Sequence, residues 1–231
     1  MHTSMHTLIL FDIDGTLVRG GPAKIAFNTA MLETYGTAGA VESYDFSGKT
    51  DPQIARELLS DAGLDDGVIE AGFDALWDRY IEELESRMGA NPMRLLPGVA
   101  SLIEALDSEP DVAIGLVTGN IIRGARLKLG SVGLAQCFEV GAYGSDHGVR
   151  EHLPAIALQR AFEAWGVTFP PESAVIVGDT PRDVECGKHA GTRTVAVATG
   201  RPRRELLETT GADAIFDDLS DIASVLEALL A

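Results

Sequence analysis

Two aspartates one residue apart, Asp12 and Asp14, are the first residues of this chain whose types and spacing could do chemistry. They follow the apolar run 8–11 and precede Gly15, a pattern typical of a buried strand that ends in a turn. Because alternate side chains of an extended chain point the same way, both carboxylates would project together from the strand's carboxyl end. Two such acids repel each other, which favours a divalent cation or a shared proton between them. The plainer alternative is two loop acids that close a strand.

A second acidic pair follows the apolar run 175–177. Asp179 would lie at the tip of this strand and Asp183 one turn into the next element, so both could face one ion. Gly178 would allow a close approach of the backbone. In the alternative, Asp179 or Thr180 caps a helix and Asp183 lies in its first turn, where negative charge is favoured anyway.

A hydroxyl ends a third apolar run, in the sequence Thr118, Gly119 and Asn120. A hydroxyl and free backbone N–H groups at the start of a helix form a site that suits phosphate. A routine turn with a helix cap is the alternative.

The elements that position these residues alternate in type beyond residue 92, which predicts parallel βαβ units in an open, doubly wound α/β sheet. Ligands of such sheets bind at the carboxyl ends of the strands. After the first strand, further strands are expected at 112–117, 138–141, 174–177, 194–198 and 214–216. Helices of this part are expected at 99–108, 121–131, 153–165, 183–190, 203–210 and 219–230.

Between the first strand and the rest lies a block with helical patterns only, residues 20–91. It is therefore an insertion directly after the two aspartates, and we expect it to cover them as a cap domain. Residues 1–19 and 92–231 would form the α/β core. An accessory helical domain without a catalytic part is the alternative. The cap helices are expected at 23–35, from Thr50 or Asp51 to Gly63 with Pro52 in the first turn, and at 67–88.

The amino-acid composition limits the classes of molecule that the protein could bind. A formal charge of −17 over 231 residues would repel nucleic acid and anionic membranes, so we expect neither as a partner. An anionic substrate would need a locally cationic pocket or a metal. The two cysteines, Cys137 and Cys186, have neither zinc-site nor disulfide-framework spacing. Residues 1–7 lack a basic flank and the apolar run after them is short, which favours a cytoplasmic location over secretion or membrane insertion.

The order of these motifs resembles that of the haloacid dehalogenase-like (HAD) hydrolase superfamily, with residues 12–16 matching its Asp-x-Asp-Gly-Thr motif. Thr118 matches the Ser or Thr that ends its second core strand, and Asp179 with Asp183 matches its acidic motif. The inserted helices look like the cap of the phosphoglycolate phosphatase-like subgroup. The resemblance covers essentially the whole chain.

This chain departs from the family in the residue that supplies positive charge to neutralise the phosphoryl oxygens. The family usually carries a Lys upstream of the acidic motif, and here Arg150 is the best-placed cation, in a Gly-flanked loop. An arginine can fork onto phosphate, so the exchange is chemically tolerable. The alternative is a surface arginine paired with a nearby acid. Weaker candidates for the same position are Lys128, Lys188 and Arg123.

The resemblance implies a Mg²⁺-dependent phosphatase acting on a small phosphorylated metabolite. Asp12 would be the nucleophile that forms an aspartyl phosphate, and Asp14 the general acid and base. The metal would be held by Asp12, by Asp14 through its backbone carbonyl and by Asp179, with Asp183 orienting the metal's surroundings. Thr118 and Arg150 would hold the transferring oxygens. Gly119 and Asn120 would contact the phosphate, and Lys49, in a Gly-rich cap loop, the distal part of the substrate.

Other functions remain open on the same core. A phosphosugar mutase shares every core residue, and a phosphonatase would require Lys49 to be buried and unpaired. A dehalogenase is disfavoured because its leaving group needs no proton, which leaves Asp14 without a role. A catalytically idle phosphate-binding protein is disfavoured by the intact pair of Asp12 and Asp14. The substrate and the choice between monomer and homodimer are not predicted by the sequence.

Overall fold

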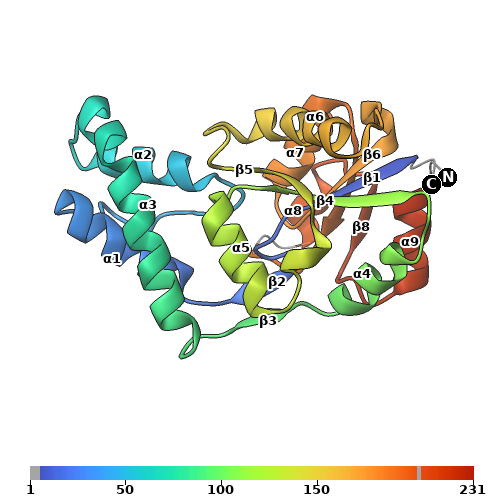
Figure 1. Ribbon diagram of the computed structural model, residues 1–231, viewed down its shortest axis with the longest axis horizontal. Helices are drawn as coiled ribbons and strands as arrows, with labels where there is room; N and C mark the ends of the chain where they lie inside the picture. Colours follow the sequence, from blue (N-terminus) through green and yellow to red (C-terminus); the bar gives the residue numbers. More distant parts are fainter. Residues whose placement is uncertain (1–5, 202–203) are drawn as a thin grey trace.

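A parallel six-stranded sheet forms the core of the computed structural model, which describes residues 6–201 and 204–231. The strand order is β5-β4-β1-β6-β7-β8, so β1 lies in the middle between β4 and β6 (Figure 1). This central position explains the uninterrupted apolar run of β1, because such a strand is buried on both faces. The strands are β1 Thr7–Phe11, β4 Val112–Thr118, β5 Val140–Tyr143, β6 Ala174–Gly178, β7 Arg193–Val197 and β8 Ala214–Phe216.

Two layers of helices cover the sheet. Ile9 and Phe11 of β1 belong to the apolar core on one face, whereas Leu8 and Leu10 belong to that on the other. The first face is covered by α4 Val99–Asp107, α5 Ile122–Ser131 and α9 Ile222–Leu230. The second face is covered by α6 Leu153–Trp165 and α7 Pro181–Ala190, drawn above the sheet in Figure 1. The predicted doubly wound α/β architecture is confirmed.

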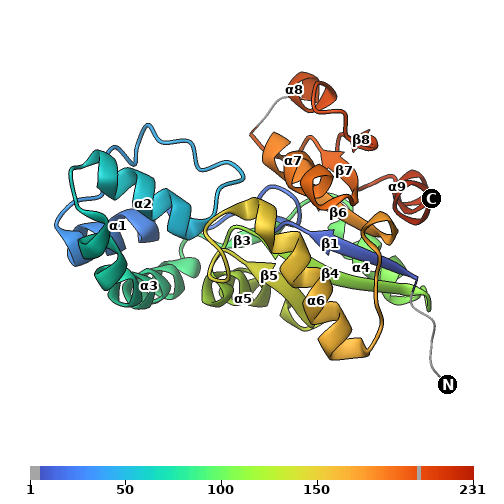
Figure 2. The same cartoon turned by 90° about the horizontal axis from the view of Figure 1, so that it is seen from above.

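The inserted helices lie beside this core, at the left end of Figures 1 and 2. They share an apolar core of their own, to which Phe27, Leu58 and Leu76 contribute. Thr50 caps the second helix, since its side chain accepts a hydrogen bond from Gln53 N at 3.2 Å. The helices are α1 Ala23–Tyr35, α2 Asp51–Asp61 and α3 Asp66–Met88. The expected helical insertion is therefore present.

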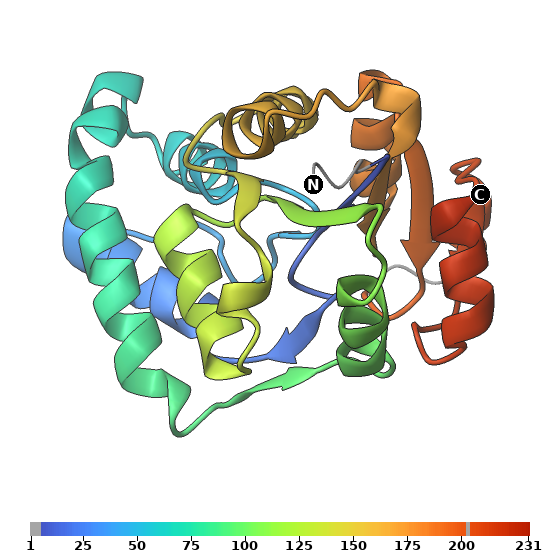
Figure 3. The ribbon, with the colours of Figure 1, turned by 45° about the vertical axis from the view of Figure 1, so that its right-hand side comes forward.

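A short antiparallel ribbon, which the sequence did not predict, joins the core to the inserted helices. Its strands are β2 Val18–Gly20 and β3 Met93–Leu95, with Gly20 paired to Met93. Figure 3 shows the two connections running side by side. Strands of three residues carry too little periodicity to be recognised in a sequence. The ribbon places the root of the insertion four residues after Asp14, next to the carboxyl end of β1.

Element boundaries differ from the expected ones by a few residues, as is usual for helix and strand ends. β5 begins two residues later than expected, α7 begins two residues earlier and α9 three residues later. The helix expected at 203–210 is observed as α8 Arg204–Glu208, and Arg203 lies outside the described residues. The described residues also contain three short 3₁₀-helices, η1 Ala135–Cys137, η2 Arg150–His152 and η3 Pro171–Ser173. Among the described helices, none combines the length and apolar character needed to cross a bilayer.

Candidate active site

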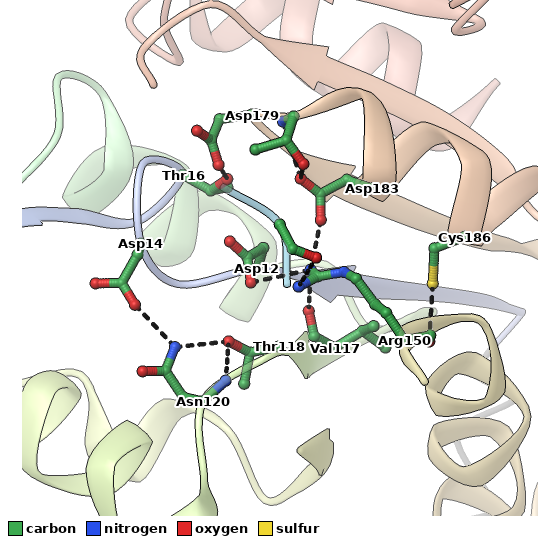
Figure 4. A network of polar contacts seen from close by, with 12 residues as sticks. Asp12, Asp14, Thr16, Val117, Thr118, Asn120, Arg150, Asp179, Asp183 and Cys186 are labelled. Atoms are coloured by element: carbon green, nitrogen blue, oxygen red, sulfur yellow. Dashed lines mark hydrogen bonds and ion pairs between the residues drawn. The ribbon is translucent and has the colours of Figure 1, made fainter. Parts of the chain in front are cut away.

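Three buried carboxylates meet at the carboxyl end of the sheet. Asp12 follows β1 and Asp179 follows the neighbouring strand β6, and the N–H of Asp12 donates to Val177 O at 2.9 Å. Asp183 joins them from the first turn of α7. One carboxylate oxygen from each aspartate lies within 4.8 Å of the others (Figure 4). Both acids of the second predicted pair, but only Asp12 of the first, therefore lie in this group.

Asp183 makes different contacts with its two oxygens. Oδ2 accepts hydrogen bonds from the N–H and the hydroxyl of Thr180, at 2.9 and 2.7 Å, and so completes the cap of α7. Oδ1 accepts from the guanidinium of Arg150. These contacts are compatible with both interpretations of this residue, because each uses a separate oxygen. The part of Asp183 in a metal site stays a prediction.

Arg150 points into the site rather than to solvent. Only 4% of the residue is exposed, and Nη2 donates to Asp12 Oδ1 at 3.1 Å, to Val117 O at 3.2 Å and to Asp183. Its Nε has no hydrogen-bond partner among the described residues. The guanidinium thus lies between the nucleophile candidate and the first turn of α7, where the sequence placed the missing cation (Figure 4).

We call Asp12, Asp179, Asp183 and Arg150 the aspartate cluster. It contains three acids and one cation, so ionisation of all its members leaves a buried negative surplus. Burial raises the pKa of Asp12 to about 6, helped by repulsion from Asp183 and Asp14 and opposed by Arg150. Burial, with repulsion from Asp183 and Asp12, also raises the pKa of Asp179 well above its ordinary value. Crowded carboxylate oxygens with surplus charge fit Mg²⁺, a hard cation that prefers oxygen ligands.

Two glycines leave room for the carboxylate of Asp179. A Cβ at Gly15 or at Gly200 would collide with this carboxylate, and Gly15 also has a φ of +88°. Thr16 Oγ1 donates to Asp179 Oδ1 at 3.4 Å. The Gly-Thr pair after Asp14 therefore does more than turn the chain, because it packs against the acid of the neighbouring strand.

Asp14 lies apart from these acids, in a second group that we call the Lys128 cluster: Asp14, Asn120 and Lys128. Asp14 Oδ2 accepts from Asn120 Nδ2 at 2.8 Å and from Lys128 Nζ at 2.5 Å. Lys128 Nζ also donates to Asn120 Oδ1 at 2.6 Å. Asn120 Nδ2 further donates to the buried hydroxyl of Thr118 at 2.9 Å. The hydroxyl of Thr118 therefore contacts Asn120, which in turn contacts Asp14 (Figure 4). The predicted contact of Thr118 with transferring oxygens stays a prediction.

Lys128 is the residue whose importance the sequence analysis missed. It was weighed only as a weaker rival of Arg150, yet the residue is 3% exposed and its ammonium contacts Asp14. Burial alone would lower the pKa of Lys128, but Asp14, Tyr80 and Asp51 raise it above its ordinary value. One signal was available: its helix neighbours Ala125 and Leu129 are core residues, so helical periodicity places Lys128 toward the interior.

The insertion contacts the core through the start of α2. The N–H of Asp51 donates to Gly119 O at 2.8 Å, and its Oδ2 accepts from Ile121 N at 2.8 Å. Thr50 Oγ1 donates to Gly148 O at 2.7 Å. A Cβ at Gly119 would collide with the backbone carbonyl of Lys49, so this approach requires glycine. The insertion is thus closed over the carboxyl ends of the strands.

A cavity of about 540 Å³ lies between the insertion and the core and reaches both clusters. Its lining includes the aspartate cluster members Asp12 and Asp179, together with Gly119. The insertion contributes apolar and aromatic residues and further lysines: Ala23, Lys24, Phe27, Phe46, Lys49, Ile54 and Tyr80. The cavity therefore offers a polar floor and a partly aromatic wall, as ligand sites commonly do.

Lys49 does not present a free ammonium to this cavity. Its Nζ lies 2.6 Å from Glu57 Oε2 and 2.7 Å from the hydroxyl of Tyr44. The predicted contact between Lys49 and the distal part of a substrate would require this ion pair to rearrange, and it stays a prediction.

Comparison with known proteins gives one consistent result. Residues 9–197 match the family described as haloacid dehalogenase-like hydrolase. An N-acetylmuramic acid 6-phosphate phosphatase of Pseudomonas putida is 29% identical over 226 residues, covering 96% of each chain. A phosphoglycolate phosphatase of Rhodobacter capsulatus is 27% identical, covering 96% of this chain and 98% of its own. The crystal structure of a predicted phosphoglycolate phosphatase from Haemophilus somnus shares the fold, with a TM-score of 0.70 and 21% identity over 96% of this chain and 98% of that chain.

Proposed function

This chain belongs to the haloacid dehalogenase-like hydrolase family, and from that premise we propose a Mg²⁺-dependent phosphatase that acts on a small phosphorylated metabolite through an aspartyl phosphate on Asp12. The observation that carries the proposal is the separation of two neighbouring carboxylates into different surroundings. Asp12 is buried beside Arg150 in the aspartate cluster, whereas Asp14 faces the cavity beside Lys128. One acid is suited to attack, and the other to move protons.

The proposed reaction has two halves. In the first, an oxygen of Asp12 bonds to phosphorus while the bond from phosphorus to the ester oxygen breaks, and Asp14 gives its proton to the leaving alkoxide. In the second, Asp14 takes a proton from water, and the water oxygen attacks the phosphorus of the aspartyl phosphate. The bond to Asp12 breaks, inorganic phosphate leaves and the enzyme returns to its starting state.

The residues of the aspartate cluster fit a divalent cation. Asp12, Asp179 and Asp183 would hold Mg²⁺ with their carboxylates, and Asp14 would add its backbone carbonyl. When bound, the ion supplies positive charge that lets an anionic nucleophile approach an anionic phosphate. Arg150 would bind the transferring oxygens from the opposite direction, since its guanidinium already lies at Asp12.

The phosphate itself would lie against the loop after β4. Gly119 and Asn120 line the cavity, and Thr118 keeps the amide of Asn120 oriented. The cavity has room beyond a phosphate for a small organic group, which would lie against the aromatic residues of the insertion. The relatives named above act on N-acetylmuramic acid 6-phosphate and on phosphoglycolate, and both are members of the proposed substrate class.

A phosphonatase and a phosphosugar mutase are the two alternative functions on the same core. The ion pair between Lys49 and Glu57 speaks against a phosphonatase, which would need an unpaired lysine there. A phosphosugar mutase would use the same core residues and differs in its product. A mutase returns a phosphosugar isomer, whereas a phosphatase releases inorganic phosphate.

The test is a screen of phosphorylated metabolites, including phosphoglycolate and N-acetylmuramic acid 6-phosphate, for release of inorganic phosphate in Mg²⁺. We expect release from at least one of them, its loss in EDTA and its return with excess Mg²⁺. Isomerisation of a sugar phosphate without phosphate release would replace the proposal with a mutase. Full activity in EDTA would contradict the metal requirement.

A further inference from the structure

We propose that Lys128 is a positioning residue for Asp14, whose carboxylate it holds in place together with Asn120. The inference rests on the proposed phosphatase function, because it assigns Lys128 a role through the residue that serves there as acid and base. The sequence analysis weighed Lys128 only as a weaker rival of Arg150 and gave it no role beside Asp14.

The geometry is a closed triangle of three side chains. Lys128 Nζ lies 2.5 Å from Asp14 Oδ2 and 2.6 Å from Asn120 Oδ1, and Asn120 Nδ2 lies 2.8 Å from Asp14 Oδ2. The hydroxyl of Thr118 accepts from the same amide nitrogen and fixes which end of Asn120 faces Asp14. Each member of the triangle therefore restrains the other two.

The exposure of the two charged side chains differs in a way that suits this role. The side chain of Asp14 is 44% exposed and reaches into the cavity, whereas that of Lys128 is 4% exposed. A half-exposed aspartate without partners would sample several rotamers. An ammonium behind it, fixed in the packed interface of α5 with the insertion, restricts it to one region of the cavity.

Stability alone does not explain a lysine at this position. Burying an ammonium is costly, and apolar residues of similar volume often replace buried ion pairs without loss of stability. Among the described residues, Asp14 is the only carboxylate that forms an ion pair with Lys128. The other charged or titratable groups near it come from the insertion, Asp51 and Tyr80, and the carboxylate of Asp51 is already bonded to Ile121 N. The interaction that Lys128 gains at this position is therefore its ion pair with Asp14.

Placement matters for a general acid, because it must lie within hydrogen-bond reach of the leaving oxygen. A displacement of about 1 Å can lower a rate by roughly 100-fold. The loss should be largest for esters whose leaving group needs a proton. Esters of acidic phenols leave without one and should be affected less.

The test compares Lys128→Met, which removes the charge at similar length, with Lys128→Arg, which keeps it. Lys188→Met, at an exposed position of α7, is the matched control and should leave both activities unchanged. With phenyl phosphate we expect Lys128→Met to lose roughly 100-fold in kcat/KM, which reports the steps up to departure of the leaving group, and with p-nitrophenyl phosphate less than about tenfold. In kcat, which includes the hydrolysis of the aspartyl phosphate that both esters share, the losses can be alike. Lys128→Arg should recover part of the loss with phenyl phosphate.

A double variant separates positioning from direct phosphate binding. In an Asp14→Asn background the acid is already absent, so adding Lys128→Met should change kcat/KM by no more than about twofold. Equal losses in kcat/KM with both esters, or a full additional loss in the Asn background, would overturn the proposal and make Lys128 a phosphate ligand or a purely structural residue. If circular dichroism shows that Lys128→Met is unfolded, the same comparison is made with Lys128→Gln, which keeps a donor without the charge.

The experiments distinguish an error in the proposed phosphatase function from an error in the proposed role of Lys128. Wild-type protein that hydrolyses neither ester and no metabolite in Mg²⁺ would remove the phosphatase proposal and this inference with it. Wild-type activity that depends on Asp14, combined with losses in kcat/KM at Lys128 that do not depend on the leaving group, would remove the positioning role alone.

Discussion

The aspartate cluster and the Lys128 cluster lie on two sides of one cavity and differ in their charge balance. The first combines three buried carboxylates with one guanidinium, and the second pairs one carboxylate with one ammonium. An unbalanced group of oxygens can accept a divalent cation, whereas a balanced pair gains nothing from one. The difference indicates why a metal would bind at one side of the cavity and protons would move at the other.

Exposure separates the two clusters as well. The Asp12 side chain is 8% exposed and held by Arg150, and that of Asp14 is 44% exposed. A nucleophile benefits from a fixed position, while a proton carrier must reach both the leaving oxygen and the incoming water. The two aspartates follow the same strand, and they differ because Asp12 contacts Arg150 whereas Asp14 contacts Asn120 and Lys128.

The largest expected effect comes from removing the nucleophile. Asp12→Asn should lower kcat by about 10⁴-fold or more, because an amide of nearly the same shape cannot form the acyl phosphate. The fold should persist, since the substitution removes one negative charge from a crowded cluster. Steady-state phosphate release and thermal unfolding without metal measure the two effects. Appreciable turnover by pure Asp12→Asn would contradict the mechanism.

Exchange of Arg150 comes next. Arg150→Ala leaves three buried carboxylates without their cation, so we expect kcat to fall by about 10²- to 10³-fold. Leaving buried charges without a partner should also lower the free energy of unfolding by about 3–5 kcal/mol. Arg150→Lys should recover part of both losses, because it keeps the charge but not the fork.

The matched control for this exchange is Arg123→Ala, which removes an arginine that is half exposed and paired with Asp78. It should leave kcat and stability nearly unchanged. Equal losses for Arg123→Ala and Arg150→Ala would mean that general positive charge, rather than the position of Arg150, matters.

The local pattern of the sequence was sufficient to predict that the residues of the aspartate cluster lie close together. Asp12 and Asp179 each end an apolar run, and parallel strands bring such ends to one edge, so their meeting follows from the topology. The contacts of Arg150 with two aspartates agree with its predicted place, because a Gly-flanked loop before the strand leading to Asp179 can turn inward. Roles in the reaction remain predictions for all of these residues.

Burial and pairing across the interface between insertion and core could not be predicted in this way. Lys128 is buried only because α5 packs against α3 of the insertion, where Gly124 approaches Tyr80. The pair of Lys49 with Glu57 lies within the insertion, where the loop before α2 folds back toward that helix. Both contacts depend on how the chain folds back on itself, which the pattern of a single sequence does not display. The β2–β3 ribbon was not predicted for a related reason, because each of its strands is defined by pairing with a strand far away in the sequence.

Weakening of the metal site should have a smaller effect that depends on conditions. Asp179→Ala removes one candidate ligand while Asp12 and Asp183 remain, so we expect the Mg²⁺ concentration for half-maximal activity to rise by about 10- to 100-fold. Activity at saturating Mg²⁺ should fall much less. Asp14→Asn is the comparison variant from the other cluster, and its Mg²⁺ requirement should stay near that of the wild type. A raised requirement in both variants would contradict the division into a metal side and a proton side.

The smallest expected effect concerns Asp51, whose negative charge is added to the Lys128 side of the cavity only as the pH rises through about 6. Loss of hydration raises the pKa of Asp51 to about 6, although Lys128 and the N–H of Ile121 oppose the shift. An aspartate in the unfolded chain has a pKa of about 3.9, so between about pH 4 and 6 the folded state binds more protons than the unfolded state. The contribution of Asp51 to stability is therefore complete below about pH 4 and is lost as the pH rises through about 6.

Asp51→Asn removes this titration and keeps an oxygen that can accept from Ile121 N. Relative to wild type, the variant should gain unfolding free energy between pH 4.5 and pH 7.5, on the order of 2 kcal/mol. Urea unfolding of both proteins in EDTA across this range measures the difference, in which titration of the aspartate cluster cancels. Asp61→Asn, at the exposed far end of α2, serves as the control. A constant difference between Asp51→Asn and wild type would show that Asp51 is ionised throughout, and the Lys128 side of the cavity would then carry the charge of Asp51 below pH 6 as well as above it.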